Sequence, residues 1–187
     1  MIEKRLLNEI EHGKFIIQKG EEMWNWSSPS GVLRLKRRVQ MFYKFLQGEN
    51  KSVLEIGCGT GLFTQEFAKL NHTVTAIDIS PELVDIAKQR CNGCNIDFKI
   101  ENAYSTSFKN DTFDYIVGSS VLHHLDVDKA FEEFYRLLKP GGSFMFTEPN
   151  MINPQIAIQR NVPYIGRKTC NSPDETAFVK RKIKKKI

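Results

Sequence analysis

The stretch VLEIGCGTGLFT, residues 53–64, constrains the fold more than any other part of the 187-residue chain. A run typical of a buried strand leads into Gly57, Gly59 and Gly61, and a helix is expected to start at once. Glycines permit a tight turn with positive backbone angles and let a ligand approach the backbone. A helix that starts there presents free amide groups and a positive dipole. The pattern predicts a ligand site at the carboxyl end of a parallel strand.

Short apolar runs alternate with helical stretches between residues 51 and 147. We expect helices over residues 60–70, 81–90 and 126–138, and strands at Ser52–Ile56, Thr73–Ile79, Ile96–Ile100, Thr112–Gly118 and Ser143–Thr147. Such alternation builds a doubly wound, mainly parallel α/β sheet with helices on both faces. Helical patterns over residues 6–15 and 32–46 predict a helical N-terminal extension.

An acid at the end of the second strand narrows the choice of ligand. Asp78 follows the glycine loop by about twenty residues, where a carboxylate can accept hydrogen bonds from both hydroxyls of an unphosphorylated ribose. The alternative is an ordinary strand-end acid or helix cap. The third glycine comes one residue too early for a dinucleotide fingerprint, and Leu62 and Phe63 would crowd a pyrophosphate. Glu55, just before the loop, favours a cationic ligand over a diphosphate. We therefore expect a nucleoside without phosphates.

The same residues resemble a known family. EIGCGTG (residues 55–61) followed by AIDIS (76–80) is similar to the class I S-adenosylmethionine-dependent methyltransferases. FKNDTFDYIVGSSVLHHL (108–125) resembles the fourth-strand segment of that family, and LLKPGGSFMFTEPN (137–150) resembles its fifth-strand segment. The subgroup that looks most similar is the small-molecule, quinone-biosynthesis type. The resemblance implies a Rossmann-like methyltransferase fold, S-adenosylmethionine as cofactor, and in-line transfer of a methyl group to a small-molecule acceptor.

The resemblance also implies which residues hold the methionine part of the cofactor. Gly57, Gly59 and Gly61 would form the turn against it, with Cys58 in the same loop. Glu55 would help to anchor that end, directly or through water.

The nucleoside part of the cofactor is implied to lie farther along the sheet edge. Asp78 would hold the ribose hydroxyls, and Ile79 would lie on the adenine face. Asn102, followed by Ala103, stands where the family commonly has an acid, and its carbonyl can accept from the adenine amino group. Ser119 follows the fourth strand and would lie near the methionine moiety.

His123 and His124 are the candidate catalytic residues. They follow the fourth strand, and either can act as a general base because histidine titrates near neutrality. The alternative is a structural or pocket-lining role. No third ligand accompanies them, so no metal site is expected. Glu148 ends the fifth strand, where it either faces the substrate or anchors the residues beside it.

Three residues near the N-terminus match a region that often closes over the site in this family: Trp24, Trp26 and Arg37. Core packing of the tryptophans and a solvated helix face for the arginine are the alternative, which we favour.

The net charge of +5 does not predict a nucleic-acid surface. Six positive charges lie in residues 180–187, and the rest of the chain is nearly neutral, so we expect no nucleic-acid partner. That tail is expected to be the solvated face of an amphipathic helix, with a membrane or nucleic-acid patch as the alternative. Four cysteines are too few for a disulfide scaffold, and the Cys91–Cys94 pair lacks further metal ligands. No membrane span and no signal peptide are expected, which favours a cytoplasmic protein.

We expect three parts in the chain: a helical N-terminal cap (1–50), an α/β core that binds S-adenosylmethionine (51–150), and a loop with an amphipathic helix (151–187). Sheets of the family usually have seven strands, and the last two are expected to be missing here. The fifth strand would then be an edge that residues after 150, an oligomer or a partner must cover.

Two other functions compete with an active methyltransferase. One is a non-catalytic cofactor-binding or partner-binding domain that lacks the C-terminal strands. The other is a nicotinamide oxidoreductase, which the glycine spacing and Glu55 disfavour.

Overall fold

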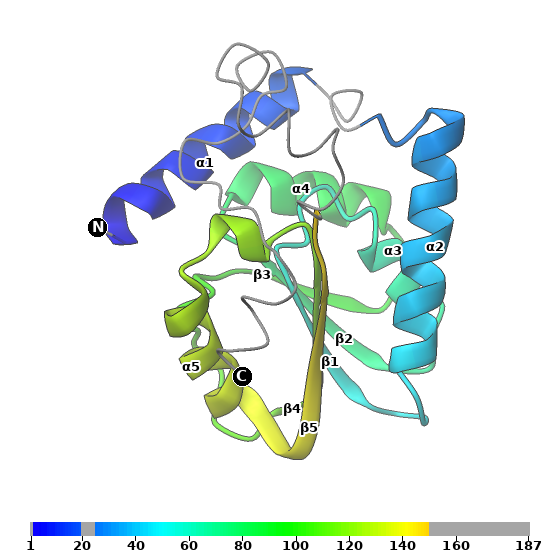
Figure 1. Ribbon diagram of the computed structural model, residues 1–187, viewed down its shortest axis with the longest axis vertical. Coiled ribbons are helices and arrows are strands. Elements are labelled where there is room, and N and C mark those ends of the chain that lie inside the picture. Colours follow the sequence, from blue (N-terminus) through cyan, green and yellow to red (C-terminus); the bar gives the residue numbers. More distant parts are fainter. Residues whose placement is uncertain (1, 20–24, 150–187) are drawn as a thin grey trace.

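A parallel sheet forms the centre of the computed structural model, which describes residues 2–19 and 25–149 (Figure 1). Its strand order is β3-β2-β1-β4-β5, and all four neighbouring pairs are parallel. The strands are β1 (Ser52–Ile56), β2 (Thr73–Asp78), β3 (Ile96–Ile100), β4 (Phe113–Ser119) and β5 (Leu138–Thr147). Strand order reverses between β1 and β4, so the crevice where such sheets bind ligands opens at the carboxyl ends of these two strands.

Helices cover both faces of the sheet, so the predicted doubly wound α/β fold is confirmed. They are α1 (Ile2–Lys19), α2 (Pro29–Phe45), α3 (Thr64–Phe67), α4 (Pro81–Arg90) and α5 (Val127–Leu137), with a 3₁₀ turn η2 (Leu122–His124). Two of these helices, α1 and α2, make up the predicted N-terminal extension.

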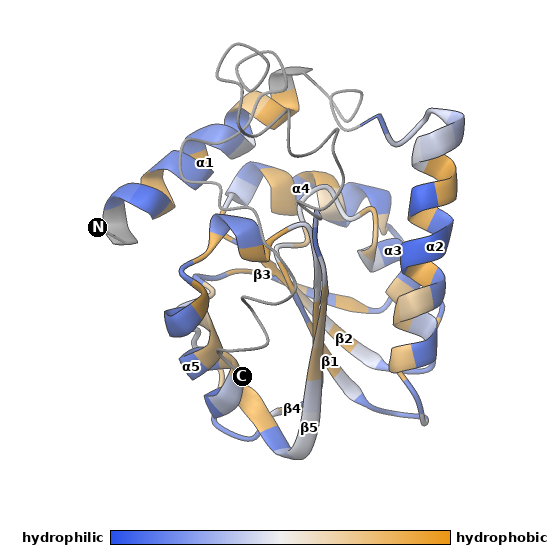
Figure 2. Cartoon of the chain, in the orientation of Figure 1, coloured by the Kyte–Doolittle hydropathy of each residue, from blue (hydrophilic) through white to orange (hydrophobic). Residues whose placement is uncertain are grey.

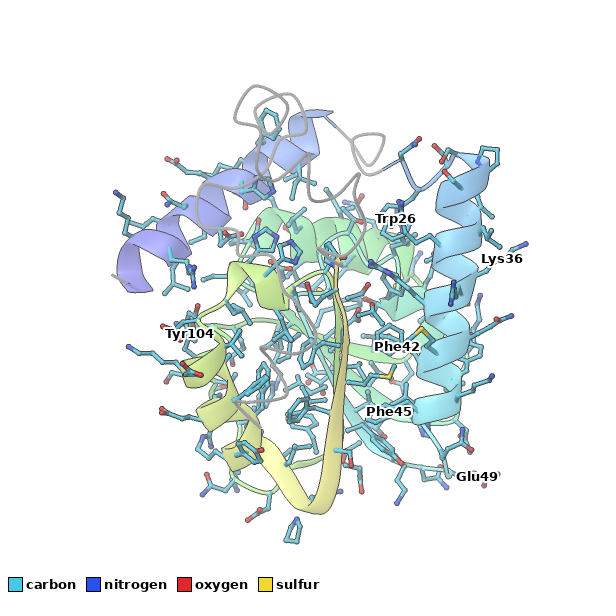
Figure 3. All side chains as sticks on the ribbon, viewed as in Figure 1. Trp26, Lys36, Phe42, Phe45, Glu49 and Tyr104 are labelled. Atoms are coloured by element: carbon cyan, nitrogen blue, oxygen red, sulfur yellow. The ribbon has the colours of Figure 1, made fainter. Side chains whose placement is uncertain are left out.

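Successive side chains of a strand point to opposite faces of the sheet, and this divides the hydrophobic core into two layers. Val53 of β1 packs with Phe42 of α2 and Phe67 of α3, whereas its neighbour Leu54 packs with Phe134 of α5 on the other face. Figure 2 shows the hydrophobic residues concentrated along the strands and on helix faces turned toward them. In Figure 3, Phe42 and Phe45 point from α2 toward the sheet and Lys36 points away. The position of α2 is therefore fixed by its apolar stripe.

Local signals set where several helices begin. Ser28 caps α2, because its hydroxyl accepts a hydrogen bond from the Gly31 N–H (3.0 Å). Asp126 is the N-cap of α5. Ser80 occupies the expected N-cap position of α4, but its hydroxyl donates to Glu82 (3.1 Å) instead of capping the backbone.

Two elements differ from the sequence prediction. The helix expected over residues 60–70 shrinks to α3, four residues long, because Gly61 has φ +80° and cannot belong to a right-handed helix. Strand β5 starts at Leu138 rather than Ser143, directly after α5. Its register with β4 jumps between Leu138 and Ser143, so the expected stop at residues 139–142 is an irregularity within the strand.

Strand β5 is an edge of the sheet in the described part of the chain. The predicted C-terminal loop and amphipathic helix (151–187), Trp24 and the lysine-rich tail lie outside the described residues. The division into cap, core and tail and the covering of the β5 edge therefore stay predictions. Neither length nor hydropathy lets any helix within residues 2–19 and 25–149 traverse a lipid bilayer.

Candidate active site

A cavity of about 380 Å³ lies at the carboxyl ends of β1 and β4. That volume is within the range of small-molecule sites. Its walls come from α1, α2, the glycine loop, and the residues that follow β2, β3 and β4. Most residues expected from the sequence line it, namely Glu55, Gly57, Cys58, Gly59, Asp78, Ile79, Asn102, Ala103, Ser119, His123 and His124. The topology thus brings together side chains from four separate strand ends.

The glycine loop shapes one wall of the cavity. Gly57 has φ +67°, and a Cβ added there would collide with the side chain of Val121 after β4. Gly59 has φ +53°, and a Cβ added there would meet no atom within 4 Å. Gly61 is not part of the cavity wall, because it packs against Ala87 of α4, where a Cβ would lie 3.0 Å from the Ala87 Cα. Of the three glycines, Gly59 is therefore the one beside which the cavity has open space for a ligand.

Asp78 connects the loop to the end of β2. Its Oδ2 accepts from the Gly59 N–H (2.9 Å), and its Oδ1 accepts from the Ser80 N–H (3.0 Å). Burial raises the pKa of Asp78, although these backbone hydrogen bonds oppose the rise. Each carboxylate oxygen has two acceptor sites, so both can still take a hydrogen bond from a ligand.

Glu55 is the most deeply buried acid of the cavity, with 2% of its surface exposed. Burial raises its pKa to about 8, while the hydrogen bond from the Thr64 hydroxyl (2.6 Å) opposes that rise and Asp78 adds to it. The group is therefore largely neutral at pH 7, and a cation bound nearby would favour its ionised form.

Asn102 and its neighbours line the side of the cavity after β3. The Asn102 Oδ1 accepts from the Tyr104 N–H (3.0 Å), which holds the amide in one orientation. That oxygen has a second lone pair for a ligand donor. The Tyr104 hydroxyl in turn accepts from the Asp126 N–H (2.8 Å) at the start of α5.

Arg38 is a cavity residue that the sequence analysis missed, since it singled out Arg37. Arg37 is exposed, as the favoured alternative expected, whereas Arg38 donates to the hydroxyls of Ser119 (2.9 Å) and Ser120 (2.8 Å). Burial lowers the pKa of Arg38 to about 10. Its position four residues before the buried Phe42 was the signal in the sequence, because residues i and i+4 share a helix face.

Trp26 lines the cavity beside Arg38 and lies near the upper end of α2 in Figure 3. The Arg38 guanidinium lies 5.5 Å from the Trp26 ring centroid, and Arg34 lies 4.3 Å from it. The ring also contacts Phe63 of the core edge-on, at 5.9 Å between ring centroids. Trp26 therefore combines core packing, the favoured alternative, with a place in the cavity wall.

The two histidines after β4 have different partners. The His123 Nδ1 lies 2.5 Å from Oε2 of Glu148, and the His124 Nδ1 lies 2.9 Å from Oε2 of Glu9 on α1. The other Glu148 oxygen accepts from the N–H groups of Val121 and Leu122. Glu148 is thus an anchor, but its partners belong to the turn after β4 and not to Pro149 and Asn150, which were the residues expected.

Comparison with known proteins identifies the family to which the chain belongs. A family model described as a methyltransferase domain matches residues 54–146, which run from the middle of β1 through the glycine loop to most of β5. The chain belongs to the class I S-adenosylmethionine-dependent methyltransferases. This membership argues against the nicotinamide oxidoreductase interpretation, because the cofactor of the family is S-adenosylmethionine.

Relatives of the methyltransferase agree with this assignment. A ubiquinone biosynthesis O-methyltransferase of Coxiella burnetii is 29% identical over 135 residues, which cover 70% of this chain and 58% of that protein. A solved S-adenosylmethionine-dependent methyltransferase of Methanosarcina mazei matches with a TM-score of 0.61 and 26% identity, over 76% of this chain and 79% of that one. The PH0226 protein of Pyrococcus horikoshii shares the fold, with a TM-score of 0.64, 22% identity and coverage of 76% and 65%. The chain thus spans less than two thirds of the length of the Coxiella relative.

Proposed function

We propose that this chain transfers a methyl group from S-adenosylmethionine to a small-molecule acceptor within the cavity between α1, α2 and the sheet. The observation that carries the proposal is the donor and acceptor set gathered at the β1–β4 switch point. Asp78 ends β2, where the Gly59 and Ser80 N–H groups hold it, and the buried Glu55 lies in the neighbouring β1. Arg38 donates to the hydroxyls of Ser119 and Ser120 at the end of β4, on the other flank of β1. An acid-rich side and a cationic side suit a ligand with hydroxyl, ammonium and carboxylate groups.

The cavity fits the cofactor on three observations. Gly59 leaves space that a side chain would fill. Asp78 keeps acceptor capacity on both oxygens for the ribose hydroxyls. Hydroxyl groups, rather than carboxylates, are the hydrogen-bond partners of the Arg38 guanidinium in the described part of the chain, so the guanidinium is available to the ligand's carboxylate.

With the ribose hydroxyls of the cofactor at Asp78 and its carboxylate at Arg38, the other residues of the site can be assigned to parts of the cofactor. Gly57, Cys58, Gly59 and Ser119 would contact the methionine part, and Glu55 would favour its ammonium group. Ile79, Asn102 and Ala103 would contact the adenine, and Gly61 would support the loop from behind. When bound, the cofactor supplies an activated methyl group on a positively charged sulfur. The protein must align the acceptor with it and exclude water.

The acceptor is proposed to be a small molecule, because relatives of comparable sequence are named as ubiquinone biosynthesis O-methyltransferases. A cytoplasmic location is supported by the free thiols of Cys58, Cys91 and Cys94, which are typical of a reducing compartment. An oligomer or partner at the β5 edge would cover its unpaired backbone groups.

Calorimetric titration with S-adenosylhomocysteine tests the proposal, with NAD as the ligand control. We expect saturable binding, no response to NAD, and loss of binding in Asp78→Ala. Asp97→Ala is the matched control, because Asp97 is exposed on β3 outside the cavity wall. A folded chain that does not bind would contradict the cofactor site. Binding without methyl transfer to any acceptor would support the non-catalytic domain instead.

A further inference from the structure

The turn after α4 brings two cysteines together. The Cys94 N–H donates to the Cys91 carbonyl oxygen (2.9 Å), which closes a four-residue turn, and Gly93 within it has φ +82°. Such a turn holds the Cα atoms of its first and fourth residues within about 7 Å, and a disulfide usually spans about 4.4–6.8 Å between Cα atoms. Both thiols are free in this structure. The backbone therefore permits a disulfide between Cys91 and Cys94.

The two cysteines differ in their exposure to solvent. Cys94 is exposed, whereas only 3% of the surface of Cys91 is exposed. Burial raises the pKa of the Cys91 thiol to about 11, and the nearby Cys94 and Glu55 add to that rise. An oxidant from solution therefore reaches Cys94 first, because it attacks an accessible thiol more readily than a buried one. Cys91 is then the second thiol, which attacks the oxidised sulfur of Cys94.

Cys91 also contacts the glycine loop. Its thiol donates to the Gly61 carbonyl oxygen, which lies 3.9 Å from Sγ. The preceding residue, Arg90, donates to the Thr60 hydroxyl (3.1 Å). A Cβ added to Gly61 would lie 3.0 Å from the Ala87 Cα, so there is no slack between loop and helix. The end of α4 thus packs directly against the loop that forms one wall of the cavity.

We propose that Cys91 and Cys94 form a reversible disulfide in the presence of hydroperoxides, and that this disulfide weakens cofactor binding at the glycine loop. The inference rests on the proposed function, because it concerns regulation of the same site. A disulfide sulfur carries no proton, so the oxidised Cys91 no longer donates to the Gly61 carbonyl. The new bond also draws a buried side chain toward an exposed one, which removes its packing against the loop.

The oxidation balances with one hydroperoxide. The Cys94 sulfur attacks the O–O bond and becomes a sulfenic acid, and an alcohol leaves, or water where the oxidant is hydrogen peroxide. The Cys91 sulfur then attacks the Cys94 sulfur, the S–S bond forms, and the sulfenic oxygen leaves as water. Two thiols and one hydroperoxide thus give one disulfide, one water and one alcohol. A thiol reductant reverses the bond by exchange, so the disulfide is transient in a reducing compartment.

Peptide mass mapping locates the disulfide. Trypsin cleaves after Arg90 and Lys99, so both cysteines fall within one peptide, residues 91–99. After treatment with hydrogen peroxide, we expect this peptide to be lighter by two hydrogens and to resist alkylation until a reductant is added. Cys170→Ser is included in every protein assayed, because Cys170 would otherwise offer a competing thiol.

Titration calorimetry with S-adenosylhomocysteine measures the effect on the site. We expect the disulfide form to bind about 5-fold or more weakly than the reduced form, and a reductant to restore the affinity. Cys94→Ser is the matched control, because it leaves Cys91 beside Gly61 but cannot form the disulfide. Its affinity should equal that of the reduced parent chain before and after peroxide treatment.

The coupling between the disulfide and the ligand must be reciprocal. Saturating S-adenosylhomocysteine should therefore shift the equilibrium of the cysteine pair in a glutathione buffer toward the two thiols. The factor should equal the ratio of the two affinities measured by calorimetry. Alkylation of the peptide at a series of glutathione ratios, with and without the ligand, gives this factor.

Several outcomes would overturn the inference: two alkylatable thiols in the 91–99 peptide after peroxide, a disulfide that joins Cys91 to Cys58 in the 52–69 peptide instead, or a disulfide form that binds as tightly as the reduced chain. A loss of affinity that also occurs in Cys94→Ser would place the sensitive group elsewhere and overturn it as well. Failure of the proposed function looks different, because the reduced chain would then not bind S-adenosylhomocysteine, while the mass of the peptide would still report the disulfide.

Discussion

At the scale of single residues, Glu55 is an acid in a buried position of the site, where its ionised form is unfavourable. The chain buries this acid within β1, and burial raises its pKa from the ordinary 4.5 to about 8. The folded state then holds a proton that the unfolded chain loses above pH 4.5. Stability from this group therefore falls as the pH rises from 4.5 to 8, by at most about 1.4 kcal/mol per pH unit.

Glu55→Gln should remove this loss of stability at high pH, because glutamine does not ionise. Its amide oxygen can still accept a hydrogen bond from the Thr64 hydroxyl. We expect the variant to be more stable than wild type by up to about 4 kcal/mol at pH 8, and by less than about 1 kcal/mol at pH 5. Thermal melts at the two pH values, with Glu132→Gln as the exposed control, measure the difference. An equal gain in stability at both pH values would show that the gain does not come from the ionisation of Glu55.

At the scale of elements, α2 separates two neighbouring arginines by about 100° of rotation around the helix axis. Arg38 falls on the side of the cavity, and Arg37 falls on the solvent side. Arg38→Ala should weaken binding of S-adenosylhomocysteine about 10- to 100-fold, because a hydrogen bond to a charged group contributes about 1.5–3 kcal/mol. Arg37→Ala should bind as the wild type does. Titration calorimetry of the pair checks this, and equal affinities would remove Arg38 from the binding site.

At the scale of the whole molecule, the cavity joins α1 to the sheet. Leu6, His12 and Ile16 of α1 line it, and Gly13 packs so closely on Ser80 that a Cβ there would lie 2.7 Å from the Ser80 hydroxyl oxygen. Figure 1 shows α1 lying across the end of the sheet near α4. A ligand in the cavity contacts both parts and should stabilise their association.

Hydrogen–deuterium exchange should therefore slow in α1 when S-adenosylhomocysteine binds. The expected effect is a clear rise in protection over residues 4–17, with little change in α5, none of whose residues lines the cavity. Exchange in α1 that stays the same at saturating ligand would show that the helix does not close the occupied site.

The sequence alone determined the parallel α/β fold and most of the cavity residues. The alternation of strands and helices and the glycine loop are local patterns, and strand ends of a parallel sheet meet at one edge whatever the details. Asp78, Gly59 and Asn102 could be placed at that edge because each lies at the end of a strand or within three residues after it.

Only the tertiary structure decided which polar side chains meet. Arg38 rather than Arg37 enters the cavity because the apolar stripe of α2 fixes its rotation against the sheet. Glu148 meets His123 because β5 pairs beside β4, a contact between residues 25 positions apart in the chain. The helix α3 is short because Gly61 has a positive φ, which the helical spacing of the apolar residues does not reveal. Such pairings depend on packing between distant segments, and local propensity carries no information about them.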